Sequence, residues 1–233
     1  TTNLLSQERV KIKDYNKIEK ELGKLGKHDT ILIDPQKVNY HLYKHIGEKA
    51  TVIEKLSPAA LLKARKNSVE LEGFRNAMVA DGVALTKFFI WLEQNVDSAT
   101  ITELTIAEKL REFRSLNSNF ISESFDTIAG YADHGAIVHY SATQQTSYTI
   151  KPEGFLLVDS GGQYYSGTTD ITRTVHLSTP SAEEMQDYTL VLKGMIQLSM
   201  INFPVGTRGT QLDVLARMAM WNKNINYGHG TGH

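Results

Sequence analysis

Apolar residues that recur every three or four positions predict most of the helices in this chain. The strongest repeat follows Asn67-x-x-Glu70, a spacing that favours a capped helix start, and it continues to about Gln94. Its apolar members lie on one stripe: Leu71, Phe74, Met78, Leu85, Phe89 and Leu92. A stripe of this width packs against a core. We therefore expect a long amphipathic helix whose stripe is structural and has no ligand role.

Start and stop signals predict further helices on either side of this one. Ser57-Pro58 opens a short helix, because proline is favoured in the first turn. Thr102 can cap a helix from residue 104 to about residue 113. Ser181 opens another, whose first-turn glutamates suit the helix dipole, and Pro204 with the glycine that follows ends it.

The final predicted helix covers residues 211–221. It contains Asp213 and Arg217, which are four positions apart and therefore neighbours on the helix surface. This pair fits a structural ion pair better than a catalytic role.

Short apolar, β-branched runs predict the strands. We expect strands at residues 125–129 and 136–139, and a hairpin of residues 155–158 and 171–175 joined by a glycine-rich turn. Helices followed by strands are typical of an α+β layout, in which helices pack against a curved antiparallel sheet.

Residues 1–56 form a small section with its own alternation of elements. The pattern predicts helix, strand, helix and strand at residues 8–24, 30–34, 38–46 and 51–53. This α/β alternation is too short for a full doubly wound domain. His41 and His45 share one face of the second helix, and we interpret them as surface histidines in preference to metal ligands.

Two aspartates flank the turn of the predicted hairpin. If the turn is centred on Tyr164 and Tyr165, Asp159 faces Asp170 across the strands, with Cβ atoms roughly 5 Å apart. Two carboxylates at that distance repel unless a cation lies between them or one holds a proton. Two interpretations stay open: a divalent metal site, or ordinary aspartates of a solvated turn.

The chain closes with a glycine-rich histidine motif, residues 227–233. Its glycines oppose a helix, and in an extended segment His229 and His233 share one face because they are four positions apart. Neutral imidazole is a common metal ligand. The motif is therefore compatible with a metal site and equally with a glycine loop whose histidines are solvated.

Composition narrows the class of protein. The net charge of −1 gives no electrostatic argument for binding nucleic acid or an anionic membrane. The absence of cysteine excludes disulfides and thiolate metal sites, and it fits a reducing compartment. No apolar run is long enough to span a bilayer, and no signal peptide is visible. We expect a cytoplasmic protein with neither nucleic acid nor membrane as a partner.

Three motifs, taken together and in order, resemble one family. They are VDSGGQYYSGTTDITRT (158–174), GAIVHY (135–140) and GHGTGH (228–233), and they resemble the Xaa-Pro aminopeptidases (aminopeptidase P) of the pita-bread metallopeptidases. The match is closest to the large, three-domain cytosolic type. The resemblance implies an α+β pita-bread catalytic domain over residues 57–233. It also implies that residues 1–56 are the C-terminal part of a middle, non-catalytic domain.

The resemblance also implies a site. The family binds two divalent ions, Mn²⁺ by resemblance, through two aspartates, one histidine and two glutamates. Asp159, Asp170 and His233 match the first three ligands. His139 and His229 match catalytic histidines that bind substrate, although the residues around His139 alone favour a core histidine. The two glutamates belong to motifs downstream of the histidine motif, so we expect a fold incomplete at its C-terminus and a fragment that is itself inactive.

The implied activity is release of the N-terminal residue from peptides with proline in the second position, by a metal-bridged hydroxide. The family often dimerises, so a homodimer is expected. Prolidase, a dipeptidase with the same fold and metals, is the first alternative. A pita-bread binding module that has lost catalysis is the second. A creatinase-like member is disfavoured, because such members lack the metal ligands, whereas Asp159, Asp170 and His233 are present here.

Overall fold

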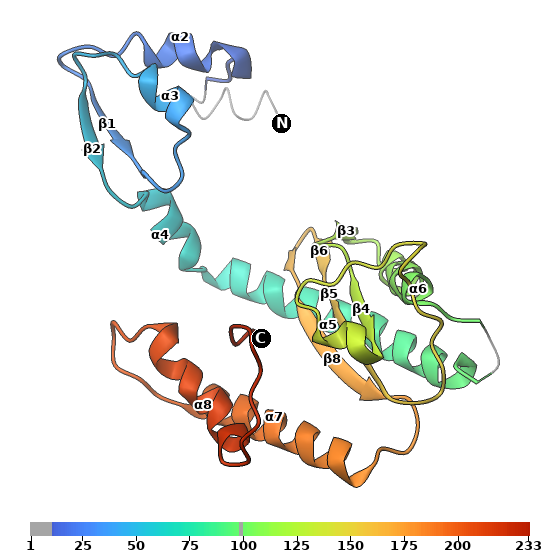
Figure 1. Cartoon of the computed structure of the whole chain (residues 1–233). Coiled ribbons are helices and arrows are strands. Elements are labelled where there is room, and N and C mark those ends of the chain that lie inside the picture. The colour runs from blue at the N-terminus through green and yellow to red at the C-terminus, as the bar shows by residue number, and fades with distance from the viewer. Residues whose placement is uncertain (1–10, 98–99) are drawn as a thin grey trace. The chain divides into compact units, whose positions relative to one another are not determined.

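The computed structural model describes residues 11–97 and 100–233, and the chain divides into two compact units, residues 1–67 and 68–233 (Figure 1). The sequence predicted a division after residue 56. The structural division instead follows helix α4 (Pro58–Ala64), which belongs to the first unit. The beginning of the helix predicted from residue 8 lies outside the described residues.

The first unit is a small βαβ arrangement. Strands β1 (Thr30–Ile33) and β2 (Thr51–Glu54) are parallel, and α3 (Tyr40–Lys44) lies in the segment that connects them. A 3-10 helix, η1 (Tyr15–Lys17), and α2 (Ile18–Leu22) precede the strands. Both α2 and α3 are shorter than predicted. The 3-10 helix η1 precedes α2 and Gly23 ends it, whereas Asn39 caps α3 after the predicted start and His45 ends it.

Helix α5 (Ser68–Asn95) begins the second unit and matches the predicted long helix. Its buried residues are Ala77, Asp81, Ala84, Leu85, Phe88 and Leu92. The predicted stripe was partly wrong, because Leu71 and Met78 are exposed whereas Phe88 is fully buried. The buried face also contains a polar residue, Asp81, which pairs with the fully buried Arg114 and which an apolar repeat does not include.

Helix α6 (Glu103–Ser115) follows, and Thr102 caps it by accepting a hydrogen bond from the Thr105 N–H, as the sequence predicted. Strands β3 (Phe120–Glu123) and β4 (Ile128–Tyr131) come next. The strand predicted at residues 136–139 is wrong: a 3-10 helix, η2 (Ala132–Ala136), and a turn replace it. Ala132 and His139 both have positive φ, 52° and 55°, which an extended strand cannot accommodate.

Two three-stranded antiparallel sheets carry the rest of the unit. Strand β5 (Phe155–Ser160) lies between β4 and β8 (Ile171–His176), and β6 (Gly162–Tyr164) lies between β3 and β7 (Gly167–Thr168). Helices α5 and α6 pack against the first sheet (Figure 1). The buried core consists of Leu85, Phe88, Leu92, Val96, Ile101, Ile106, Leu110, Ala129, Tyr131, Ile150, Leu156, Val158 and Ile171. The predicted α+β class is confirmed.

Helices α7 (Ala182–Met200) and α8 (Gly209–Trp221) form an antiparallel pair at the end of the chain (Figure 1). Ser181 and Glu184 form a capping box at the start of α7, as the predicted helix start requires. The two helices approach closely at Gly194, where an added Cβ would lie 2.0 Å from the Ala216 carbonyl oxygen. Glycine is therefore needed at this crossing.

Candidate metal centre

The hairpin places Asp159 and Asp170 near each other, but not in the predicted register. Asp159 on β5 is opposite Thr172, and Asp170 directly precedes β8. The predicted pairing was wrong because Tyr165 and Ser166 form the turn, one position later than expected, which moves every partner by two residues. A shift of two leaves side chains on the same face of the sheet. The two carboxylates are therefore diagonal neighbours, which are still within reach of each other.

The terminal motif brings His233 to this pair. Its Nε2 lies 3.0 Å from Asp170 Oδ1 and 4.0 Å from Asp159 Oδ1. Ligand atoms of all three side chains lie within 4.8 Å of one another. The hairpin and the end of the chain thus contribute to one cluster, which we call the Asp–Asp–His cluster.

The donors of this cluster suit a divalent cation. Asp159 Oδ1 is buried and has no hydrogen-bond partner among the described residues. A buried carboxylate oxygen without a partner costs free energy, which a cation at the cluster would offset. The side chains of Asp170 and His233 are about half exposed, 53% and 54%, so an ion can reach them from solvent. Two carboxylates and one imidazole are ligands for Mn²⁺, Zn²⁺ and similar ions.

An ion pair on α8 holds the terminal motif in place. Arg217 Nε donates to Asp213 Oδ2 at 2.6 Å, which confirms the predicted ion pair. The same guanidinium donates to the carbonyl oxygens of Tyr227 and His229, at 2.8 and 2.6 Å. The hydrogen bond from Arg217 is the main cause that lowers the pKa of Asp213 to about 2. Thr231 also donates to Asp213, so this pair fixes the loop that ends at His233.

The two predicted substrate-binding histidines lie outside the Asp–Asp–His cluster. His229 is exposed, its Nδ1 lies 2.7 Å from the Gly230 carbonyl oxygen, and its ring stacks on Tyr227. His139 is exposed on the turn that follows η2. Their catalytic and substrate-binding roles stay predictions.

A buried carboxylate that sequence reasoning missed anchors the segment around His139. Glu103 is almost fully buried and accepts hydrogen bonds from the backbone N–H groups of Tyr131 and Tyr148 and from the Tyr140 hydroxyl. His134 is also buried, and its Nδ1 lies 2.9 Å from Glu103 Oε1. A glutamate in the first turn of a helix is explained by the dipole alone, so the sequence carries no signal for this burial.

A second buried network lies behind the hairpin. Arg114 is fully buried and donates to Asp81 at 2.6 Å and to the Ser160 hydroxyl at 3.0 Å. The Tyr164 hydroxyl donates to the same Asp81 at 2.8 Å, and burial together with this contact raises the pKa of Tyr164. Ser160 directly follows Asp159, so the network fixes the strand end from which that carboxylate extends.

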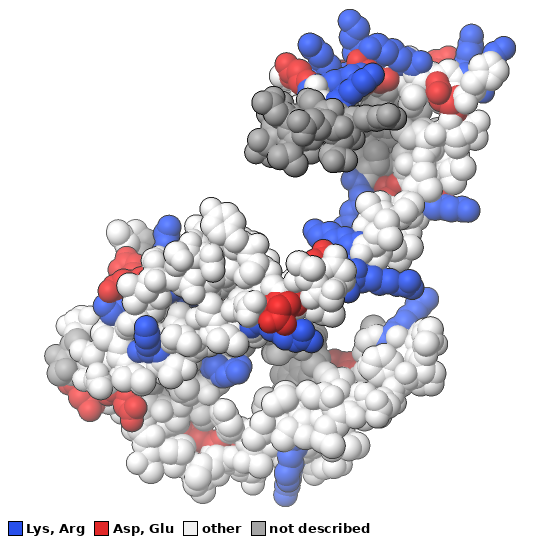
Figure 2. Space-filling view, turned by 180° about the vertical axis from the view of Figure 1, so that it is seen from behind, with Lys and Arg blue, Asp and Glu red and all other residues white. Residues whose placement is uncertain are grey.

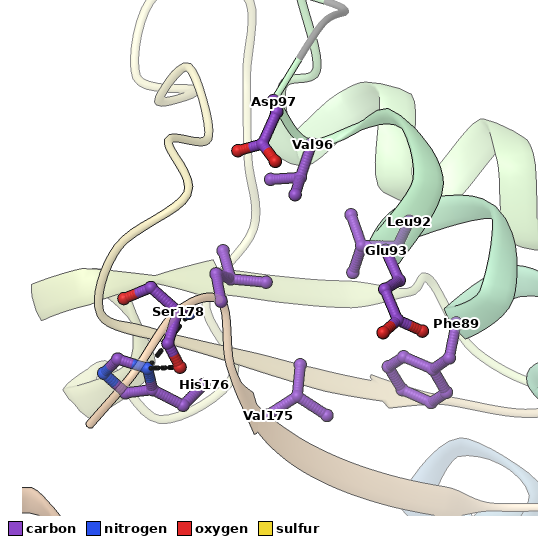
Figure 3. Close-up of a pocket in the computed structure, with 9 residues that line it drawn as sticks. Phe89, Leu92, Glu93, Val96, Asp97, Val175, His176 and Ser178 are labelled. Atoms are coloured by element: carbon purple, nitrogen blue, oxygen red, sulfur yellow. Dashed lines mark hydrogen bonds between the residues drawn. The ribbon is translucent and has the colours of Figure 1, made fainter.

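A cavity of 440 Å³ lies elsewhere, between the end of α5 and the end of β8 (Figure 3). Its lining includes Phe89, Glu93, Asp97, His176 and Ser178. The His176 ring hydrogen-bonds to Ser178 there. None of the predicted site residues lines this cavity, so the candidate chemistry lies at the open Asp–Asp–His cluster.

Comparison with known proteins decides the family. The model of metallopeptidase family M24 matches residues 72–233, and the model of the creatinase/prolidase N-terminal domain matches residues 1–70. The chain belongs to metallopeptidase family M24. The Asp–Asp–His cluster lies wholly within the part that matches the M24 model.

Curated relatives of this M24 chain are named as Xaa-Pro aminopeptidases. A probable Xaa-Pro aminopeptidase P of Podospora anserina is 40% identical over 240 residues, covering 98% of the chain and 35% of the relative. Xaa-Pro aminopeptidase 2 of Mus musculus is 41% identical, covering 96% of the chain and 33% of the relative. The chain thus spans about a third of the length of these relatives, and the resemblance found in its motifs is confirmed.

Solved structures show the same fold for the M24 chain. The X-prolyl aminopeptidase of Caenorhabditis elegans, described as a cytosolic enzyme with a di-nuclear active site, has a TM-score of 0.85 and 33% identity, over 98% of the chain and 38% of that protein. Prolidase of Pyrococcus furiosus has a TM-score of 0.71 at 22% identity, over 92% of the chain and 60% of the prolidase, and shows the fold alone. The predicted pita-bread fold is confirmed.

Proposed function

We propose that this M24 chain carries the metal centre of a Xaa-Pro aminopeptidase, which releases the N-terminal residue from peptides with proline in second position. The observation that carries the proposal is the convergence of Asp159, Asp170 and His233, whose ligand atoms lie within 4.8 Å of one another. Identity of about 40% to Xaa-Pro aminopeptidases supports the substrate class.

The three cluster residues would hold divalent ions, and we propose two Mn²⁺ ions as the cofactor. The di-nuclear active site ascribed to the C. elegans relative supports the number of ions. When bound, such ions activate water as a nucleophile and polarise the scissile carbonyl. The buried oxygen of Asp159 lies on a strand end held from behind by Arg114 and Ser160, so the first ligand is rigidly positioned before an ion arrives.

His139 and His229 are proposed to hydrogen-bond to the substrate and to the developing oxyanion. Because Nδ1 of His229 faces the Gly230 carbonyl oxygen, its Nε2 would donate only in the imidazolium form. His139 is presented on a turn whose neighbour, Tyr140, is tied to buried Glu103. His229 is held through its carbonyl oxygen by Arg217, so its ring is free of that contact. Both residues are exposed, which a role in binding a peptide requires.

The 233-residue chain alone is proposed to bind Mn²⁺ weakly and to lack turnover. Its cluster offers three side-chain ligands, and hard cations such as Mn²⁺ hold more than three oxygen or nitrogen ligands. Peptide hydrolysis also needs a side chain that acts as general base and general acid, and none of the three cluster residues is assigned that role. Metal-dependent cleavage of Xaa-Pro tripeptides by the purified chain would contradict this part of the proposal.

The metal centre is tested by calorimetric titration of Mn²⁺ into the chain and two variants. Asp159→Asn removes a ligand oxygen and should weaken binding at least about tenfold. Asp133→Asn, an exposed aspartate on η2, is the matched control and should bind as the unaltered chain does. Equal affinities for all three proteins would exclude the Asp–Asp–His cluster as the binding site.

Substrate class is tested in the protein that contains these residues. We expect cleavage of a tripeptide with proline second, slower cleavage when alanine replaces that proline, and loss of both with Asp159→Asn. Faster cleavage of an Xaa-Pro dipeptide than of the tripeptide would instead favour a prolidase. Within the described residues, no helix is both long enough and apolar enough to cross a membrane. The C. elegans relative, described as cytosolic, supports our proposal of a cytoplasmic location.

A further inference from the structure

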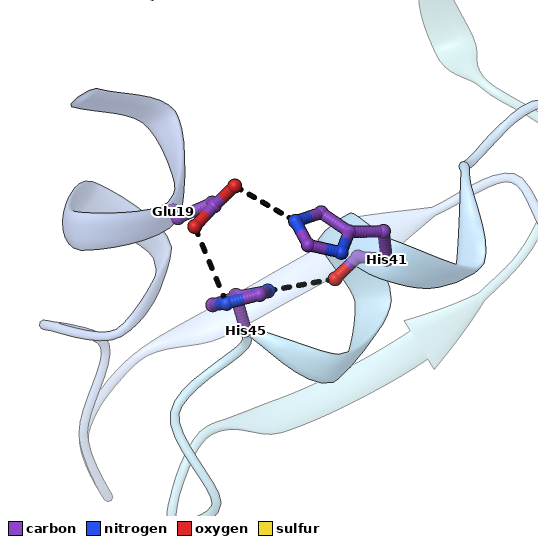
Figure 4. Close-up of side chains that lie close together, drawn as sticks. All are labelled: Glu19, His41 and His45. Atoms are coloured by element: carbon purple, nitrogen blue, oxygen red, sulfur yellow. Dashed lines mark hydrogen bonds and ion pairs between the residues drawn. The ribbon is translucent and has the colours of Figure 1, made fainter. Parts of the chain in front are cut away.

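A second group of potential metal ligands lies in the first unit, far along the chain from the M24 motifs. Glu19 extends from α2, His41 extends from α3, and His45 is the residue that directly follows α3 (Figure 4). The Nε2 atom of His41 lies 2.7 Å from one Glu19 oxygen, and Nε2 of His45 lies 3.4 Å from the other. One carboxylate is thus shared by two imidazoles. The sequence pattern indicates only the histidine pair, because Glu19 lies on another helix and its distance from the histidines depends on the fold.

The hydrogen bond made by Nδ1 of His45 determines whether Nε2 of the same ring can bind a cation. Nδ1 of His45 lies 2.8 Å from the carbonyl oxygen of His41, and a carbonyl can only accept. The proton is therefore on Nδ1, and neutral His45 directs the lone pair of Nε2 toward Glu19 (Figure 4). A lone pair facing a carboxylate is unfavourable unless a proton or a cation lies between them. A ring N–H donated to a backbone carbonyl is also the usual outer contact of a metal-bound histidine.

The spacing of the three donors suits a small ion. Ligand atoms on a tetrahedral ion with bonds of about 2.0–2.1 Å lie about 3.3 Å apart. The distances of 2.7 and 3.4 Å from Glu19 to the two Nε2 atoms lie on either side of this value. All three side chains are partly exposed, so an ion and a water ligand can reach the open fourth position.

The two helices that carry the donors are joined tightly at their ends. The Gly47 N–H, just after α3, donates to the Leu22 carbonyl oxygen at the end of α2. An added Cβ at Gly47 would lie 2.0 Å from the Leu25 carbonyl oxygen. Asn39 caps α3 by accepting from the His41 N–H at 2.7 Å. The backbone around the donors is therefore fixed, and only side-chain rotations are needed to close on an ion.

We propose that Glu19, His41 and His45 form a binding site for a late first-row divalent cation, with Zn²⁺ as the probe that defines it. Two imidazoles and one carboxylate suit Zn²⁺, Ni²⁺ and Cu²⁺, whereas Mn²⁺ and Mg²⁺ prefer sites richer in oxygen. The site would clamp α2 to α3. It is independent of the M24 centre, whose donors are two carboxylates and one imidazole.

The experiment is titration of Zn²⁺ into the 233-residue chain carrying Asp159→Asn, which removes one ligand of the M24 centre and weakens metal binding there. One equivalent should bind, and a large excess of Mn²⁺ should not displace it. Adding His45→Gln or Glu19→Gln should weaken Zn²⁺ binding at least tenfold. Adding His28→Gln, an exposed histidine of the same unit, is the matched control and should change nothing.

NMR spectra of the histidine rings in the unaltered chain provide a second test, which does not depend on whether the variants fold. Zn²⁺ should shift the signals of His41 and His45 and leave that of His28 in place. The proposal is overturned if no equivalent binds in the Asp159→Asn chain, if His45→Gln binds as tightly as the control, or if the His41 and His45 signals do not move. Those results would leave the group as an ordinary ion pair between Glu19 and protonated histidines.

Discussion

At the scale of single residues, buried Glu103 joins several parts of the chain. Its carboxylate serves two backbone N–H groups, the Tyr140 hydroxyl and His134, and the segment that carries His139 depends on all of them. This arrangement could not be predicted, because the donors come from four positions that adjoin only after the chain has folded. The local sequence pattern predicts the helix start at Thr102, but it contains no information about the residues that donate to Glu103.

Replacing Glu103 with glutamine tests this dependence. The amide keeps one acceptor oxygen, but its NH₂ group then faces donors in a buried position. We expect the free energy of unfolding to fall by about 1–3 kcal/mol, measured by urea unfolding. Glu108→Gln, on the exposed face of α6, is the control and should change stability by less than about 0.5 kcal/mol. Equal midpoints for the two variants would mean that Glu103 is not needed.

The Asp213–Arg217 pair predicts how acid affects the terminal motif. The pKa of Asp213 is lowered from its ordinary value of 3.8 to about 2, so the ion pair's contribution is complete above about pH 4 and is lost as pH falls through about 2. The backbone of residues 227–231 should therefore be ordered at pH 7 and become mobile near pH 2, as ¹⁵N relaxation would show. Arg217→Gln should make it mobile at both pH values, whereas Lys223→Gln should not. An ordered motif in Arg217→Gln would refute the role of this pair.

The sequence predicted this pair but not its function. Its spacing of four residues is visible in any helix, whereas the groups that Arg217 holds are backbone carbonyls, which every residue has. The two aspartates were a different case. The predicted turn was one position too early, which shifted the predicted pairing of the two strands by two residues. Because side chains alternate between the faces of a sheet, a shift of two residues leaves Asp159 and Asp170 on the same face.

At the scale of elements, the starts of α6 and α7 were predicted well, because a local cap defines each of them. Thr102 and Ser181 both cap as expected, because their hydrogen bonds reach only three residues along the chain. The strand predicted at residues 136–139 was wrong because contacts with distant residues determine the conformation there. Its apolar run is local, but positive φ at Ala132 and His139 belongs to a segment held by distant Glu103.

The crossing of α7 and α8 gives a prediction for Gly194. A methyl group there would lie 2.0 Å from the Ala216 carbonyl oxygen, so Gly194→Ala must push the helices apart. We expect a loss of about 1–3 kcal/mol in urea unfolding. Gly209→Ala is the matched control: its Cβ meets nothing within 4 Å, and alanine favours the helix. Greater stability of Gly194→Ala than of the unaltered chain would contradict the packing.

On the scale of the whole molecule, the second unit exposes an apolar surface on α7. The exposed side chains include Met185, Tyr188, Val191, Leu192, Met195 and Ile196. Figure 2 shows broad uncharged surface over the α7–α8 pair, whereas Lys and Arg gather on the first unit. Exposed apolar surface of this kind marks an interaction site.

We therefore expect self-association, in keeping with the homodimer that the family resemblance implies. Light scattering coupled to gel filtration should give a mass above that of one chain, and Met195→Lys should lower it toward the monomer. Gln186→Lys adds the same charge at an exposed polar position of α7 and should leave the mass unchanged. A monomeric unaltered chain at micromolar concentration would rule out association through this surface.

The unpartnered oxygen of Asp159 links the metal to the lifetime of the folded chain. In the unfolded chain water solvates this carboxylate freely, whereas folding buries its Oδ1 atom without a hydrogen-bond partner among the described residues. A divalent ion that binds only the folded form then acts as a folding ligand, contributing about 2.7 kcal/mol when its free concentration is 100-fold above its dissociation constant. The melting temperature should therefore rise with the free metal concentration, and the metal-free chain should be cleaved faster by a protease than the metal-bound chain.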